Sequence, residues 1–75
     1  MFIVLELQKM SDTQVANIVT THTGRSEAEQ KFHTILAAAA VSNVPIHSAV
    51  LMDDSGYTIK AESYTHNEEE ETNES

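Results

Sequence analysis

The chain has 75 residues, no cysteine, and 12 acidic against four basic residues, which give a formal net charge of −8. This length allows one small domain that buries only about 60% of its unfolded surface, so its core is marginal without further stabilisation. The composition excludes disulfides, thiolate metal sites, a cysteine nucleophile and a basic surface for nucleic acid, which leaves association between copies as the expected stabilisation.

The first two predicted elements are strands joined by a turn. The apolar opening Phe2–Leu5 is interrupted by Glu6, is too short to span a membrane and lacks the basic start of an export signal. We therefore expect a strand over residues 2–8 of a soluble, cytoplasmic protein. Ser11 and Asp12 favour a turn, and β-branched residues predict a second strand over residues 14–21.

One helix follows, and its pattern predicts both of its ends. Ser26 and Glu29 have the spacing of a capping box, so the helix is expected to begin at Ser26. It is expected to stop at residues 43–45, because Asn43 can adopt a left-handed cap and Pro45 has no N–H to continue. Five apolar residues form the stripe that we expect to dock on the sheet: Ala28, Phe32, Ile35, Leu36 and Ala39.

A second helical stripe is more apolar than a two-layer domain needs, so we expect another copy of the chain to pack there. High helix propensity alone could also explain its alanines. The expected residues of this oligomer interface are His33, Ala37, Ala40 and Val41 of the helix, with His47 from the strand that follows.

Residues 46–52 and 57–65 predict a second hairpin around a turn at residues 53–56, which completes the order ββαββ. The expected fold is α+β: a four-stranded, mainly antiparallel sheet with one helix on one face, in a single domain over residues 1–66. Residues 67–75 hold five acids, no base and nothing apolar, and we expect them to be disordered. A solubilising tail and a tail that captures a basic partner both remain open. Without this tail, seven acids and four bases leave a net charge of −3.

The best candidate site is the turn before the helix, because a helix N-terminus favours anions. Arg25 and the hydroxyls beside it can bind phosphate, while Lys60 and Tyr64 of the last strand can add a charge and a stacking ring. An ordinary capped turn and a solvated strand face remain the alternatives. The expected ligand-binding residues are Thr21, Thr23, Gly24, Arg25, Ser26, Lys60 and Tyr64.

The remaining polar residues do not suggest catalysis. No two of the four histidines are four residues apart on the helix, so we expect no metal site. His33 is expected to form an interface hydrogen bond, and His47 can also be a satisfied histidine on the sheet. Asp53 and Asp54 fall in a turn without a nucleophile or base. We expect neither an enzyme nor a cofactor.

The stretch EAEQKFHTILAAAAVSNVPIHSAVLMDDSGYTIKAESYTH (residues 27–66) and the opening FIVLELQ resemble short proteins of tailed phages and prophages of Gram-positive bacteria. The resemblance implies a phage setting, in which small proteins often inhibit host immunity or assist virion assembly. The leading hypothesis is an anti-defence homo-oligomer that sequesters a nucleotide-derived immune signal at pockets between subunits. The alternatives are an acidic protein–protein inhibitor of a host defence effector and a virion-assembly accessory protein. Direct binding to nucleic acid or to a membrane is not expected.

Overall fold

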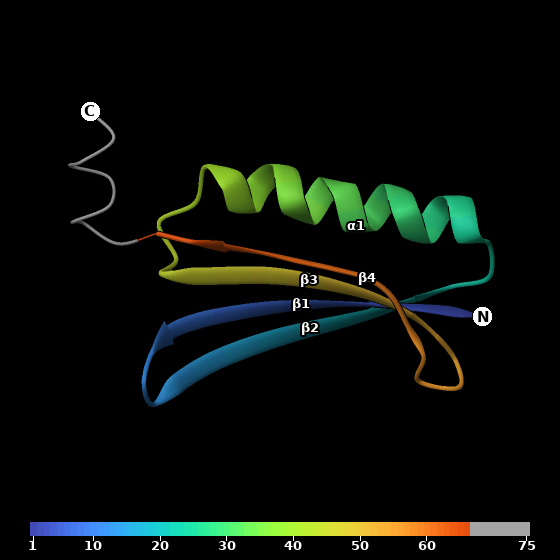
Figure 1. Ribbon diagram of the computed structural model, residues 1–75, viewed down its shortest axis with the longest axis horizontal. Coiled ribbons are helices and arrows are strands. Elements are labelled where there is room, and N and C mark those ends of the chain that lie inside the picture. Colours follow the sequence, from blue (N-terminus) through green and yellow to red (C-terminus); the bar gives the residue numbers. More distant parts are fainter. Residues whose placement is uncertain (67–75) are drawn as a thin grey trace.

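The computed structural model describes residues 1–66 and confirms the predicted α+β fold. The chain forms β1 (Phe2–Ser11), β2 (Gln14–His22), α1 (Arg25–Ala40), β3 (Ile46–Asp53) and β4 (Thr58–Thr65), in the expected order ββαββ. The four strands form one antiparallel sheet with α1 on one of its faces (Figure 1). The expected acidic tail, residues 67–75, lies outside the described residues.

The strand order is β2-β1-β3-β4, so the two hairpins lie side by side and β1 and β3 are central. The connection from β2 to β3 must cross over β1, and α1 makes this crossing. As a result α1 packs mostly over the two central strands. Figure 1 shows that α1 begins near the β3–β4 turn, whereas the β1–β2 turn lies at the opposite end of the sheet.

The hydrophobic core lies between α1 and the face of the sheet that it covers, here called the covered face. The predicted docking stripe is confirmed: Leu36 is half-buried against the core, and the other four residues of the stripe are buried. Phe32 is the largest of these side chains, and it packs with Val4 of β1 and Leu51 of β3. Burial of large apolar side chains between the two layers stabilises the domain.

The predicted capping box is wrong. The N-cap is Gly24, in extended conformation, and its carbonyl accepts the first helical hydrogen bond from the N–H of Ala28 at 3.2 Å. Ser26 already lies inside the helix and makes no capping hydrogen bond. The Glu29 carboxylate instead turns toward Arg25 and Lys60. Charged donors bind a carboxylate more strongly than a neutral backbone N–H, which explains this choice.

The end of α1 also differs from the prediction. The helix ends at Ala40, and among residues 1–66 only Gly56 has a positive φ, so Asn43 does not form a left-handed cap. The carbonyl oxygen of Ala39 accepts from the backbone N–H of Ser42 at 3.3 Å, and His66 adds a second donor, because its Nε2 lies 2.8 Å from the same oxygen. A histidine at this position hydrogen-bonds one of the last carbonyls of the helix.

The β3–β4 turn forms as expected from its residues. The Ser55 hydroxyl and the backbone N–H groups of Tyr57 and Ser55 donate to the Asp53 carboxylate, which holds the pKa of Asp53 below its usual value. Gly56 has a φ of +95°, a conformation that favours glycine. Within residues 1–66, α1 is the single helix, and it is not long and apolar enough to cross a membrane.

The face of the sheet that points away from α1 is here called the open face. Side chains alternate between the faces, so the pairing register assigns each residue. The open face comprises Ile3, Leu5, Leu7 and Lys9 of β1; Val15, Asn17, Val19 and Thr21 of β2; Ile46, Ser48, Val50 and Met52 of β3; and Thr58, Ala61, Ser63 and Thr65 of β4.

Candidate functional site

Two of the predicted ligand-binding residues, Arg25 and Lys60, meet at one carboxylate. Arg25 begins α1 and its Nε donates to Glu29 Oε2 at 3.0 Å, while Lys60 reaches from β4 and its Nζ donates to Glu29 Oε1 at 3.3 Å. The hydrogen bond from Arg25, followed by that from Lys60, holds the pKa of Glu29 below its usual value. The structure therefore gathers two cations and one anion beside the start of α1.

Both cations of this cluster are accessible to solvent. The Arg25 side chain is 56% exposed and that of Lys60 is 38% exposed, so both cations can be reached from solvent. Arginine matches phosphate oxygens with paired N–H donors, and lysine adds a mobile point charge. Arg25, Lys60 and Glu29 together carry one net positive charge, with Glu27 also in the first turn of α1. The cluster therefore offers a phosphate group two charged donors.

The other predicted residues of the turn lie near this cluster without joining it. Thr23 is exposed in the turn, Ser26 is exposed in the first helical turn, and Thr21 lies on the open face. Gly24 has a negative φ, and an added Cβ would meet nothing nearer than a Glu27 oxygen at 3.9 Å, so the fold does not require glycine there and an alanine fits.

Tyr64 lies at the far end of β4 from the cluster. It is four residues from Lys60 on the same face of the strand, which separates the two by about 13 Å. The Tyr64 ring instead stacks on His66, with ring centroids 6.2 Å apart and planes at 7°. Within one subunit, Tyr64 and Arg25 are therefore not brought together.

The sequence reading missed a hydrogen-bonded network under the C-terminal end of α1. His47 of β3 places its Nε2 2.7 Å from Glu6 Oε2 and its Nδ1 3.0 Å from Ser42 Oγ, while Gln8 Nε2 donates to the same Glu6 oxygen at 2.9 Å. The signal was present: Glu6 interrupts an apolar strand, and His47 lies on the same face of β3 as the buried Ala49 and Leu51. Two polar residues on core-facing positions indicate a paired interior contact.

Glu6 is ionised and well paired in this network. Burial by itself raises the pKa of Glu6. The hydrogen bonds from His47 and Gln8 and the charge of Lys31 together lower this pKa by more than burial raises it, so the pKa of Glu6 lies below its usual value. His47 is only 4% exposed. Its side chain therefore lies inside the subunit, which rules it out as the interface residue that the sequence predicted and matches the alternative of a satisfied histidine.

A serine, a histidine and a carboxylate that are hydrogen-bonded in series also occur in catalytic triads, where the serine is the nucleophile and the histidine is its base. Here the Ser42 hydroxyl also accepts a hydrogen bond from the backbone N–H of Val44 at 3.4 Å, and the imidazole is enclosed by the core. The network joins the α1–β3 connection to both central strands. We interpret it as the contact that fixes the end of α1 on the sheet.

The remaining predicted interface residues share the outer side of α1. His33, Ala37, Ala40 and Val41 are all exposed, and Val41 is 83% exposed. The His33 ring also touches the edge of Phe32, with centroids 5.5 Å apart. These residues stay accessible to a partner, and their role in association stays a prediction.

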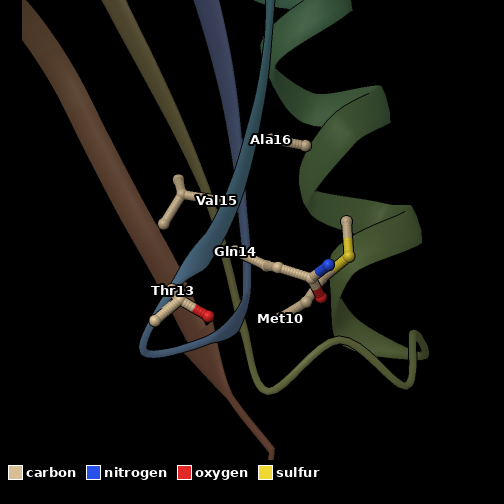
Figure 2. A pocket seen from close by; sticks show the side chains of 5 residues that line it. All are labelled: Met10, Thr13, Gln14, Val15 and Ala16. Carbon is tan, nitrogen blue, oxygen red and sulfur yellow. The ribbon is translucent and has the colours of Figure 1, made fainter.

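A shallow hollow of about 380 Å³ lies at the β1–β2 turn. Figure 2 shows Met10, Gln14 and Ala16 pointing to the α1 side of the hairpin, with Val15 pointing to the other side. No charged side chain lines this hollow. It therefore offers an anion much less than the Arg25–Lys60 cluster does.

Comparison with known protein families, curated proteins and solved structures finds no match for this chain. Among residues 1–66, no three His, Asp or Glu side chains gather as a set of metal ligands. The local chemistry of the chain therefore carries the functional argument.

Proposed function

We propose that this protein is a non-catalytic phage anti-defence protein that sequesters a nucleotide-derived immune signal as a homo-oligomer. One observation supports the proposal most directly: Arg25 and Lys60 converge from separate elements on the Glu29 carboxylate. The phage setting comes from the resemblance of residues 27–66. A sequestering protein needs affinity for the signal and no chemistry on it.

In this proposal, a phosphate of the ligand replaces Glu29 as the partner of both cations. Arg25 supplies a fork of donors, Lys60 supplies a second charge, and free N–H groups in the first turn of α1 face the same region. The ligand's base stacks on Tyr64 of a neighbouring copy, because the Tyr64 of the same subunit lies too far along β4. Contact between copies is therefore needed to enclose the whole ligand.

Isothermal titration of the full chain against cyclic mono-, di- and trinucleotides and ADP-ribose derivatives tests this function. We expect one class to bind, and Arg25→Ala and Lys60→Ala each to weaken its binding by about tenfold or more, the loss of a charged hydrogen bond. Glu29→Gln should tighten binding, since it removes the competing internal anion. Lys9→Ala is the matched control, because Lys9 is basic but lies on the open face. Absence of binding across the panel, or equal binding by Arg25→Ala, contradicts the proposal.

A second candidate is an acidic inhibitor that binds a defence enzyme. The charge distribution favours it: Arg25 and Lys60, half of the four basic residues, are already paired with Glu29. The surface that remains is mainly acidic and suits a basic partner. Deletion of residues 67–75 separates the candidates, because a charge-dependent inhibitor loses activity without its five acids, whereas nucleotide binding at Arg25 persists.

A further inference from the structure

We propose that a second copy of this chain docks on the open face, so that two sheets pack face to face across a two-fold axis parallel to the strands. This inference concerns assembly alone and is measured without any ligand. It also moves the main contact between copies from the helix, where the sequence placed it, to the opposite side of the molecule.

The open face is an apolar surface that nothing in the subunit covers. One complete row across its four strands is aliphatic, the other rows mix aliphatic with polar side chains, and Val15 and Val19 on β2 are each 55% exposed. Soluble monomers rarely expose a contiguous apolar patch of more than a few hundred Å². A sheet buries such a face against a second layer, which here has to come from another molecule.

The size of the open face is sufficient for a small interface. Eight paired residues along a strand, at about 3.3 Å each, and four strands about 4.8 Å apart give a face of roughly 500 Å². Two copies therefore bury roughly 1,000 Å² in total, which is the minimum area expected of a biological interface and indicates a weak dimer.

The charge distribution favours a second copy as the occupant. The seven acids of residues 1–66 lie on the covered face, on α1 or in turns, and none lies on the open face, where Lys9 is the single charged residue. Two molecules that each carry a net charge of −8 repel one another, and this repulsion is weakest where no acids meet. Contact between open faces keeps these seven acids of each copy out of the interface.

The open face is also complementary to itself. Its β2 side carries the half-exposed Val19, and its β4 side holds a shallow hollow of about 440 Å³ where Ala61 and Ser63 are small. A two-fold axis parallel to the strands lays β2 of one copy over β4 of the other, so Val19 of each copy meets the hollow of its partner. Such a contact uses the same patch on both copies and closes as a dimer.

The same symmetry makes each row across the sheet meet its own counterpart. The row Val19, Leu5, Val50 and Ala61 is continuous in the observed register. In the dimer, Val19 therefore faces Ala61 of the other copy and Leu5 faces its Val50, with the sheets about 10 Å apart. Both Arg25–Lys60 clusters remain on the outer sides, so enclosure of a ligand requires a separate contact near α1.

Adjacent lysine substitutions on β2 test the proposal. Val19 and Ile18 are neighbours with 55% and 50% exposure, but Val19 lies on the open face and Ile18 on the covered face. We expect sedimentation of the full chain to give a multiple of its 8.3 kDa mass. Val19→Lys should halve the sedimentation mass and leave the circular dichroism spectrum unchanged. Ile18→Lys should leave the sedimentation mass unchanged. A monomeric parent chain at tens of micromolar, or dissociation by Ile18→Lys in place of Val19→Lys, overturns the proposal.

Crosslinking provides a second measurement that does not depend on weakening the dimer. The chain has no cysteine, and Val19 and Ala61 lie about 14 Å apart across one sheet. In the Val19→Cys/Ala61→Cys variant, a bismaleimide with a span of about 10 Å should therefore join only separate chains. Ile18→Cys/Glu62→Cys is the matched control on the covered face. Dimeric product from the first variant alone supports the proposal, and product from the control alone, or from neither, overturns it.

Discussion

The face of the sheet under α1 holds Glu6, Gln8 and His47 beside its apolar core, whereas the open face holds aliphatic and small polar side chains and one charged residue among residues 1–66, Lys9. The chain thus covers its more polar face with its own helix. A few large side chains suffice to hold α1, because the polar groups beneath it pair with one another. The more apolar face is left uncovered by the subunit, and we propose a second copy as its cover.

The largest expected effect is at the centre of the covered face. Phe32→Ala removes the largest buried side chain and leaves a cavity, which should cost about 3–5 kcal/mol in unfolding free energy. Urea unfolding followed by circular dichroism measures the loss. Gln30→Ala, exposed on the same helix, should stay within about 0.5 kcal/mol of the parent chain. A small loss for Phe32→Ala would mean that the helix contributes less to the core than the sheet does.

The polar contact on the covered face gives the next largest effect. Glu6→Ala leaves the His47 imidazole buried without its carboxylate, at a cost of about 1–3 kcal/mol. The same urea measurement applies, and Glu62→Ala is the control because Glu62 is exposed on that face. Equal stability of the two variants contradicts a stabilising role for the network.

The same network predicts a loss of stability in acid. Because the folded state holds the pKa of Glu6 below its usual value of 4.5, Glu6 contributes stability above that pH and loses it as the pH falls through the folded pKa. Glu29 and Asp53 have lowered pKa values and share this dependence. Unfolding measured between about pH 6 and pH 3 should therefore have a shallower pH slope in Glu6→Gln. An unchanged slope excludes Glu6 as a contributor.

On the open face, stability should depend on protein concentration. A dimer that forms only from folded chains gains about 1.4 kcal/mol in apparent stability for each tenfold rise in concentration. Melting temperatures measured over two decades of concentration should therefore rise for the parent chain and for Ile18→Lys. They should stay constant for Val19→Lys, and a rise in that variant points to another interface.

Salt should have the smallest effect. Two copies with a net charge of −8 repel one another beyond the contact, and salt screens this repulsion. Raising sodium chloride from about 50 mM to about 500 mM should strengthen dimerisation by about two- to fivefold in sedimentation equilibrium, given the shorter screening length. Weaker association in salt indicates a contact held by ion pairs rather than by apolar burial.

The amino-acid sequence by itself determined the elements of this fold. The period of apolar residues gave the order ββαββ and the helical stripe from Ala28 to Ala39, because these patterns depend only on local geometry. The turn at Asp53–Gly56 followed from residues that hydrogen-bond their own backbone.

Tertiary structure decided which contacts form between segments that are far apart in the sequence. Glu29 was expected to cap its own helix, and only the position of β4 beside α1 offered it Lys60; likewise Glu6 meets His47 only because β1 pairs with β3. The strand order also decided which face α1 covers. Such contacts depend on how strands far apart in the chain are arranged, and short-range periodicity carries no information about that arrangement.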